Sequence, residues 1–280
     1  MKNIAAFAII LVALTACSAT RLLYSFADDF IEDQAEFYLK LEEDAEAFVD
    51  DKIDEYMDWH RTKMLPRYAA FLTATADRIE RAGRIDRAAI DDAVDRMRAL
   101  LEATVRGFTP LAAQVLVKHT GEAETNHIGA RLAERSKEQH AELDAPPESR
   151  AEERIERTQD NFERFIGDLT EGQLKIIRRH VAATAGDTLR RLDRRDRNSA
   201  RFIGFLKRRP SETEIHDFLD AMFLDPDAGA PAAEARFRES RFQRFQTFVA
   251  DILTSTTEEQ RQNLIEKLRD FAEDFRAIAS

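Results

Sequence analysis

The chain has 280 residues, of which 44% are hydrophobic and 34% charged, and its formal net charge is −11. The hydrophobic fraction excludes a disordered chain, and the acidic balance excludes a general nucleic-acid-binding protein. Nine glycines and seven prolines are few for this length, so the composition favours helices. The one cysteine leaves no disulfide within the chain.

The first residues have the pattern of an exported protein. Lys2 precedes an apolar run over 4–15, and small residues surround Cys17. A short positive start, an apolar stretch of roughly 7–15 residues and a small-residue cleavage site form a secretory signal. Arg21 ends the run before the ~20 apolar residues that a membrane-spanning helix needs. An incidental cysteine after an ordinary signal, or a cytosolic protein with an apolar N-terminus, are the alternatives.

The tetrapeptide 14–17, Leu-Thr-Ala-Cys, resembles the lipobox of bacterial lipoproteins. The resemblance implies a signal peptide at 1–16, cleavage before Cys17, and acylation of its sulfur and new amino group. Several acyl chains on one residue make a stable anchor. In such lipoproteins an aspartate after the cysteine retains the product in the inner membrane, and Ser18 stands there instead. We therefore expect an outer-membrane lipoprotein facing the periplasm, with an anchor and short tether at 17–27.

The rest of the chain, 28–280, is predicted to be an all-α periplasmic domain. Apolar residues recur at three- and four-residue steps, and no alternating β-branched run predicts a strand. The expected architecture is a bundle of antiparallel helical hairpins or an irregular superhelical array, with two sub-bundles divided near 144–148. A first helix leads to Pro66, which kinks or restarts it, and ends at Gly83. Further helices are predicted at 86–106, 122–143, 147–168, 171–207, 211–223, 232–254 and 257–279.

Three of these helices begin with capping-box spacing. A threonine or serine precedes a glutamine or glutamate by three residues, so that each side chain can bond an unpaired backbone amide of the first turn. The pairs are Thr170 with Gln173, Thr257 with Gln260, and Ser211 with Glu214.

Charge is segregated along the chain. In 28–58 only Lys40 and Lys52 oppose a run of acidic residues, whereas 175–209 is strongly basic. These segments are either two solvated or mutually facing helical surfaces, or the basic one binds anionic envelope material such as lipopolysaccharide or an acidic protein segment. The candidate binding surface consists of Arg190, Arg191, Arg194, Arg195 and Arg197.

Two aromatic stretches allow a structural and a binding interpretation. The helix at 232–254 has an apolar stripe with arginines beside it, which suits packing into the domain or contact with a membrane surface; we expect packing. On an earlier helix, Tyr56, Trp59, His60 and Lys63 share one face, and a core contact is expected there in preference to a ligand-stacking patch. The stripe consists of Phe242, Phe245, Val249 and Ile252, with Arg236, Arg238, Arg241 and Arg244 nearby.

No catalytic or metal-binding motif occurs. The six histidines form neither an HExxH motif nor an i, i+4 pair. Nucleophile-elbow and glycine-rich nucleotide motifs are likewise missing. We expect no metal, no cofactor and no enzymatic activity.

The stretches "RLLYSFAD", "WHRTKMLPRYAAFL", "LTEGQ" and "MFLDP" resemble an uncharacterised family of Gram-negative lipoproteins. That resemblance implies an all-helical, lipid-anchored envelope protein and no activity. The "LTEGQ" segment is also similar to the LTxxQ motif of Spy/CpxP-type periplasmic proteins, which are small helical chaperones or stress modulators; Thr257 and Gln260 resemble a second copy.

Two functions are compatible with these observations. One is a lipid-anchored protein that binds envelope proteins in a chaperone-like or stress-modulating way. The other is a structural or assembly lipoprotein that binds one defined partner, such as peptidoglycan, lipopolysaccharide or a secretion component. In both, Cys17 provides the membrane contact through its lipid, and nucleic acid is not a partner. The sequence does not predict the oligomeric state.

Overall fold

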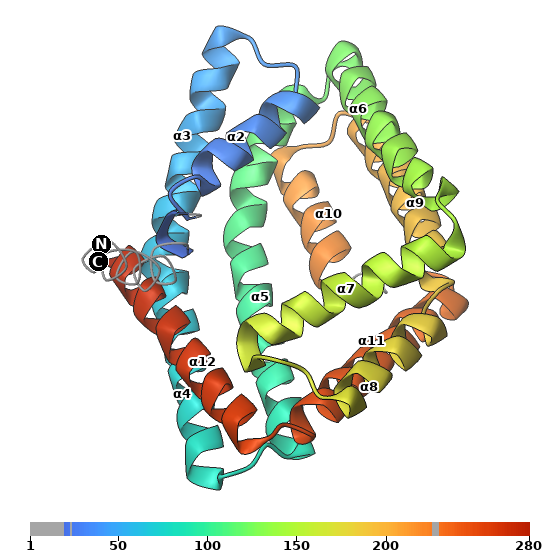
Figure 1. The fold of residues 1–280 in the computed structure, drawn as a ribbon. Helices are drawn as coiled ribbons and strands as arrows, with labels where there is room; N and C mark the ends of the chain where they lie inside the picture. The colour runs from blue at the N-terminus through green and yellow to red at the C-terminus, as the bar shows by residue number, and fades with distance from the viewer. Residues whose placement is uncertain (1–19, 23, 226–229) are drawn as a thin grey trace, which may run out of the picture.

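The computed structural model describes residues 20–22, 24–225 and 230–280, and this part of the chain is helical without a β-strand (Figure 1). The predicted all-α fold is confirmed. The signal segment, Cys17 and Ser18 lie outside the described residues. The elements are α2 (Ala27–Tyr38), α3 (Glu43–Trp59), the π-helical turn η1 (His60–Met64), α4 (Leu65–Ala82), α5 (Arg87–Leu116), the 3-10 turn η2 (Val117–His119), α6 (Glu122–Ala141), the 3-10 turn η3 (Glu142–Asp144), α7 (Pro147–Ile166), α8 (Glu171–Ala183), α9 (Asp187–Leu206), α10 (Glu212–Leu224), α11 (Ala232–Thr254) and α12 (Glu258–Ala279).

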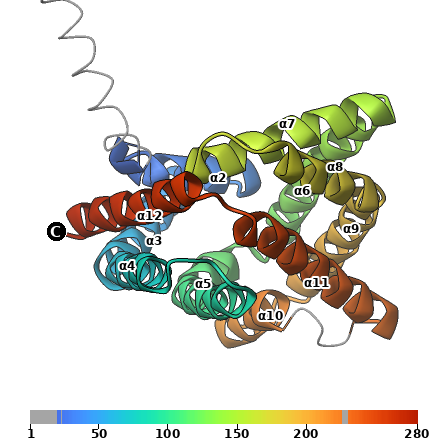
Figure 2. The same cartoon turned by 60° about the horizontal axis from the view of Figure 1, so that its bottom comes forward.

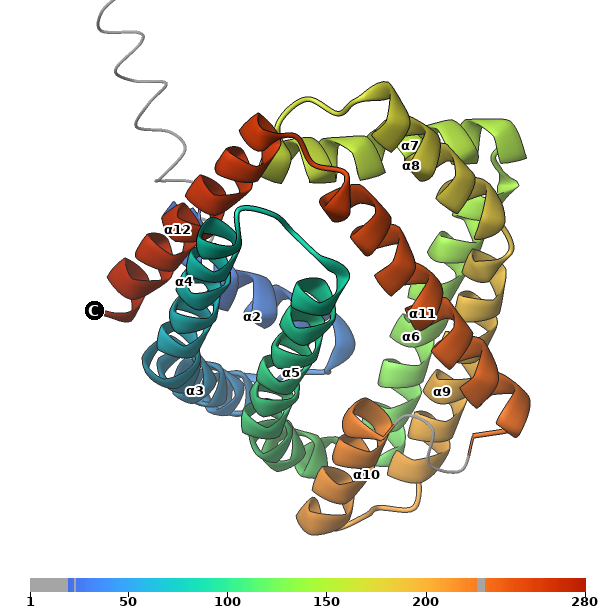
Figure 3. The same cartoon turned by 90° about the horizontal axis from the view of Figure 1, so that it is seen from below.

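The helices form a closed bundle. Consecutive helices α2 and α3, and α7 and α8, contact each other as hairpins do, but the most extensive contacts join helices far apart in the sequence. These are α4 with α12, α5 with α10, and α6 with α9, as Figures 1 and 2 show. Because the last helix packs against α4, the chain closes on itself and is not an open array (Figure 3).

Buried apolar side chains form two large cores and a small one. The first core joins α4, α5, α7, α8, α11 and α12, and the second joins α2, α3, α5, α6, α9 and α10. The third, around Met64, Phe71 and Leu100, lies beneath η1. The expected boundary near 144–148 coincides with the turn between η3 and α7, while both large cores contain residues from either side of it.

Two predicted helix boundaries are wrong, in opposite directions. The helix expected to end at residue 106 continues through Pro110 to Leu116. Pro110 removes one backbone hydrogen bond, but the adjacent Thr109 is fully buried and its hydroxyl donates to Asp220 of α10 at 2.6 Å, so tertiary contacts hold the helix together.

The helix predicted over 171–207 is instead divided into α8 and α9 by a turn at residues 184–186. The Thr184 hydroxyl donates to the carbonyl of His180 at 2.8 Å and accepts from Arg154 at 2.7 Å. Gly186 follows and has low helix propensity. Local hydrogen bonding of a threonine competes with helix continuation, and the partner from α7 adds to it.

Pro66 lies where the helix restarts, as predicted: α3 ends at Trp59, the π-helical turn η1 follows, and α4 begins at Leu65 with Pro66 in its first turn. The backbone amide of Leu65 donates to His60 across five residues, and Pro66 itself has no amide to give. A cluster of aromatic rings packs around this turn. The Tyr24 hydroxyl lies 3.1 Å from His60 Nδ1, and the rings of Tyr56 and Tyr68 lie 5.9 and 5.8 Å from the His60 ring. Of the four residues expected to make a core contact, Tyr56, Trp59 and His60 pack within the fold, whereas Lys63 is exposed.

Candidate functional site

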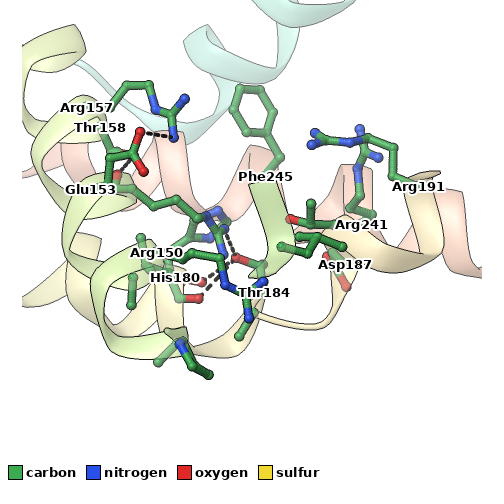
Figure 4. Close-up of a pocket in the computed structure, with 18 of the residues that line it drawn as sticks. Arg150, Glu153, Arg157, Thr158, His180, Thr184, Asp187, Arg191, Arg241 and Phe245 are labelled. Atoms are coloured by element: carbon green, nitrogen blue, oxygen red, sulfur yellow. Dashed lines mark hydrogen bonds and ion pairs between the residues drawn. The ribbon is translucent and has the colours of Figure 1, made fainter. Parts of the chain in front are cut away.

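A cavity of about 770 Å³ opens between α7, the end of α8, the start of α9 and the first half of α11 (Figure 4). Its volume is within the range of roughly 300–1,000 Å³ that is typical of ligand sites. The break between α8 and α9 borders it, because Thr184 lines the wall. The cavity therefore depends on the turn that periodicity alone did not predict.

Of the described residues, seven arginines and no lysine line the cavity. Those of α7 are spaced i, i+4 and i+7, and those of α9 and α11 are spaced i and i+3, so each helix directs one face toward the cavity. In Figure 4 arginines enter from two sides, Arg150 and Arg157 at the left and Arg191 and Arg241 at the right. The set, called the arginine wall below, is Arg150, Arg154, Arg157, Arg191, Arg194, Arg238 and Arg241.

Nearby acidic residues compensate little of this charge. The lining contains Glu142, Glu153 and Asp187. Glu153 lies 3.8 Å from Arg157 in an exposed pair, and Asp187 accepts from Arg244, outside the wall, at 2.7 Å. Five members of the arginine wall form no ion pair with another described residue: Arg150, Arg154, Arg191, Arg194 and Arg241. The buried Nε of Arg150 also has no hydrogen-bond partner among the described residues.

The cations in the wall disfavour one another. Burial, and then the charge of Arg191, lowers the pKa of Arg154. Burial lowers the pKa of Arg194 in the same way, with Arg241 as the next cause, and that of Arg238, with Arg194 as the next cause. Like charges held together away from water raise the free energy of the charged form. The wall is therefore a region of positive potential that an anion would stabilise.

An aromatic side completes the cavity. Phe245 is 51% exposed and Phe242 lies beside it, with the Arg98 guanidinium 4.3 Å from the Phe242 ring centre. His180 stacks on Phe248 with ring centres 4.0 Å apart. Burial, followed by the charges of Arg154 and other neighbours, lowers the pKa of His180. The site thus combines oxyanion-binding groups with apolar surface.

Only part of the candidate surface predicted from the sequence lies in this cavity. Arg191 and Arg194 line it. The other three have partners within the chain: Arg190 lies over the Phe237 ring at 5.1 Å, Arg195 donates to the Gln139 side chain at 2.6 Å, and Arg197 pairs with Glu234.

The candidate surface predicted from the sequence did not include the arginines of α7, nor did it indicate that they lie near those of α11. The α7 arginines are interspersed with glutamates, so the net charge of that segment conceals them; their i, i+4, i+7 spacing was the available signal. Packing of the 232–254 stripe into the domain is confirmed for Ile252, which is buried, and for Val249, which packs against the first core, but not for Phe245, which is 51% exposed. The acidic helices α2 and α3 pack against α5, α6 and η1, while α9 packs against α6, so they do not cover the basic surface.

The two predicted threonine–glutamine capping boxes are confirmed, and they meet. Gln173 and Gln260 are 0% and 4% exposed, and each side-chain amide donates to the other's carbonyl oxygen at 2.9 Å. Gln260 also donates to the backbone of Asp168 at 2.7 Å. This glutamine pair joins the start of α8 to the start of α12, at the opposite end of α8 from the cavity.

No described residues form a cluster that could hold a metal ion, and no described helix is long and apolar enough to cross a membrane. No curated protein and no solved structure matches the chain. A model of one protein family, described as a family of unknown function (DUF6279), matches residues 37–228. The match includes α7, α8 and α9 and ends before α11. The chain therefore belongs to the family of unknown function DUF6279.

Proposed function

We propose that this protein is a lipid-anchored, non-enzymatic binding protein of the cell envelope that holds an anionic envelope component in the arginine-lined cavity. The observation that carries the proposal is a cavity wall of arginines in which Arg150, Arg154, Arg191, Arg194 and Arg241 form no ion pair with a described residue. Removing a cation from water costs free energy unless a partner compensates for it. A fold that retains several such groups gives up stability, which is the usual consequence of a binding site.

The beginning of the described chain supports a position at a membrane. The Arg21 guanidinium bonds to Asp274 of α12 at 2.9 Å, and that carboxylate is 3% exposed. Close by, Leu22, Phe26 and Phe30 are 57%, 55% and 63% exposed. At about 3.6 Å per residue, Leu22 lies within about 18 Å of Cys17. We propose that acyl chains on Cys17 bring this apolar surface against the bilayer, with Ser18 directing the protein to the outer membrane.

The anchoring part of the proposal is tested by replacing Cys17 with serine. The C17S protein is expected to lose metabolic labelling with a fatty acid and to leave the membrane fraction. Ser18→Asp is the matched control, because it keeps the acylated cysteine and is expected to move the protein to the inner membrane. A C17S protein that stayed in the membrane fraction would contradict acylation.

The binding part is tested by photo-crosslinking in cells. The double variant Arg191→Gln/Arg194→Gln is expected to lose the crosslinked species that the unaltered protein forms from α9. Arg195→Gln removes an arginine from the same helix but outside the cavity, and this variant should retain the crosslinked species. Equal crosslinking by all three proteins would contradict binding in the cavity.

A second candidate is chaperone-like binding of unfolded envelope proteins. The observation that favours it is the exposure of large apolar side chains away from the N-terminus, Leu101, Leu189 and Phe223, at 53%, 50% and 47%. The purified protein should then suppress aggregation of unfolded outer-membrane proteins, and replacing these three residues by serine should abolish that effect. No suppression at several-fold molar excess would exclude this candidate.

A further inference from the structure

We infer that the ligand of the cavity carries at least two phosphate groups on a body with an apolar or ring-shaped portion. A phosphorylated glycolipid headgroup and a soluble sugar bisphosphate both have this chemistry. The inference rests on the proposed function, since it specifies which anion the arginine-lined cavity holds.

The choice of cation indicates oxyanion recognition with fixed geometry. The cavity wall contains seven arginines and no lysine. A guanidinium presents a planar fork of donors that binds two oxygens of one phosphate or carboxylate, whereas an ammonium acts as a point charge.

The amount of charge favours phosphate over a single carboxylate. With Arg238 left out of the count, and even if Glu142, Glu153 and Asp187 each offset one of the other six arginines, three positive charges remain in the wall. A phosphate monoester carries about −1.5 to −2 at neutral pH, so two of them match this excess. Two carboxylates would leave about a third of it uncompensated.

The distribution of the arginines favours two separated acid groups. Three arginines come from α7, two from α9 and two from α11, so the wall approaches the cavity from three helices. Arg150 and Arg157 lie on one side of it, and Arg191 and Arg241 on the other (Figure 4). One phosphate accepts only a few bidentate contacts, so the arginines of both sides together exceed what a single group binds.

The remaining surface is suited to a body that is not charged. Phe245 is half exposed in the cavity and Phe242 lies one turn before it on α11. A sugar ring or the first methylenes of a lipid could cover this surface and would bury apolar area that is now exposed, at roughly 25 cal/mol per Å². Neither inorganic phosphate nor pyrophosphate would do so.

The inference is tested by calorimetric titration of the purified full-length protein in a non-ionic detergent. The probes are a diphosphorylated disaccharide glycolipid, its monophosphorylated form, glucose 1,6-bisphosphate and citrate. We expect saturable one-to-one binding of the diphosphorylated glycolipid, at least tenfold tighter than that of the monophosphorylated form and of citrate. Binding of glucose 1,6-bisphosphate with similar affinity would support the same chemistry and indicate a soluble source.

Two variants separate fork geometry and apolar contact from charge. Arg194→Lys retains the charge and is expected to weaken glycolipid binding at least fivefold, with Arg195→Lys as the unaffected control. Phe245→Ala should weaken binding of the glycolipid but not of inorganic pyrophosphate. An unchanged affinity in Phe245→Ala would overturn the apolar part of the inference.

Different results would overturn the proposed anion site and the inference that its ligand is phosphorylated. Citrate or an acidic peptide binding more tightly than every phosphorylated probe, with loss in Arg191→Gln/Arg194→Gln, would overturn the phosphate inference and leave the proposed anion site standing. No binding of any anion at low ionic strength would overturn both.

Discussion

The aromatic cluster at η1 and the arginine-lined cavity are both places where helices from distant parts of the chain meet around a half-buried histidine. At η1 the rings of Tyr24, Tyr56 and Tyr68 pack around His60, and the space is filled. At the cavity His180 stacks on one phenylalanine, and the surrounding arginines leave a space that no side chain fills. Packing of distant helices around a histidine thus produces a structural contact in one region and an open site in the other.

The difference lies in what compensates each group. The half-buried rings at η1 pack against one another, so folding alone stabilises that region. Several guanidinium groups of the arginine wall have neither an acid partner nor full hydration, so folding leaves them with a cost. We therefore expect substitutions at η1 to lower stability and substitutions in the wall to raise it.

The largest effect is expected for the glutamine pair that holds the end of α8 remote from the cavity. Gln173→Ala removes the glutamine bond of a capping box, which costs about 1 kcal/mol, and leaves the buried Gln260 side chain without one of its hydrogen-bond partners, which costs about 1–3 kcal/mol more. Urea denaturation should show a loss of about 3 kcal/mol.

The matched control is Glu214→Ala, which removes a capping box at an exposed position and should cost only about 1 kcal/mol. The Gln173→Ala/Gln260→Ala double variant should lose less than the sum of the single losses, because the two side chains stabilise each other. Additive losses would show that the pair is not an energetic unit.

On α5, where it faces the aromatic cluster beside η1, Gly107→Ala should lower stability by about 1–3 kcal/mol. A Cβ at this position would overlap the six-membered ring of Trp59, a partly buried side chain that packs against the third core. Gly204→Ala is the matched control on another helix, because nothing lies within 4 Å of its added methyl group; it should stabilise the protein by about 0.4–1 kcal/mol. Equal effects would show that the aromatic cluster is loosely packed.

In the cavity, a substitution is expected to raise the free energy of unfolding instead of lowering it. Arg194→Gln removes a cation that Arg241 and its own burial disfavour, so the free energy of unfolding should rise by about 0.5–1 kcal/mol in the absence of ligand. Arg269→Gln, which breaks contacts of 2.9 and 2.8 Å to Asp77 and Glu80, should instead lower it. A loss of stability in Arg194→Gln would make the arginine wall structural.

The smallest effect concerns pH. Burial lowers the pKa of both His60 and His180 below the ordinary value of 6.5. The unfolded chain therefore binds protons first as the pH falls through 6.5, and stability decreases from there until the folded-state pKa is passed. His180→Phe keeps the stack on Phe248 and should reduce this decrease, measured by denaturation at pH 7.5, 6.5 and 5.5. An identical pH dependence would contradict the predicted protonation state.

Motifs contained within a few neighbouring residues could be predicted from the sequence, whereas contacts between distant helices could not. Thr170 and Gln173 specify a capping box within four residues, so that motif was predictable. Its partner Gln260 lies 87 residues away, and no spacing rule connects them. The turn at Thr184 depends on Arg154 of another helix, so periodicity extended one helix through it. Arg191 and Arg194 were visible as part of a basic run, whereas Arg150 became part of a site only when α7 crossed that run.

We propose that the arginine wall holds a phosphorylated anion in the cell envelope. Native mass spectrometry of the protein extracted from its own membranes in mild detergent tests this most directly. We predict a bound species that carries at least two phosphates, lost in Arg191→Gln/Arg194→Gln and retained in Arg195→Gln. An unaltered protein that carries no such species, or the same species in both variants, would contradict the account.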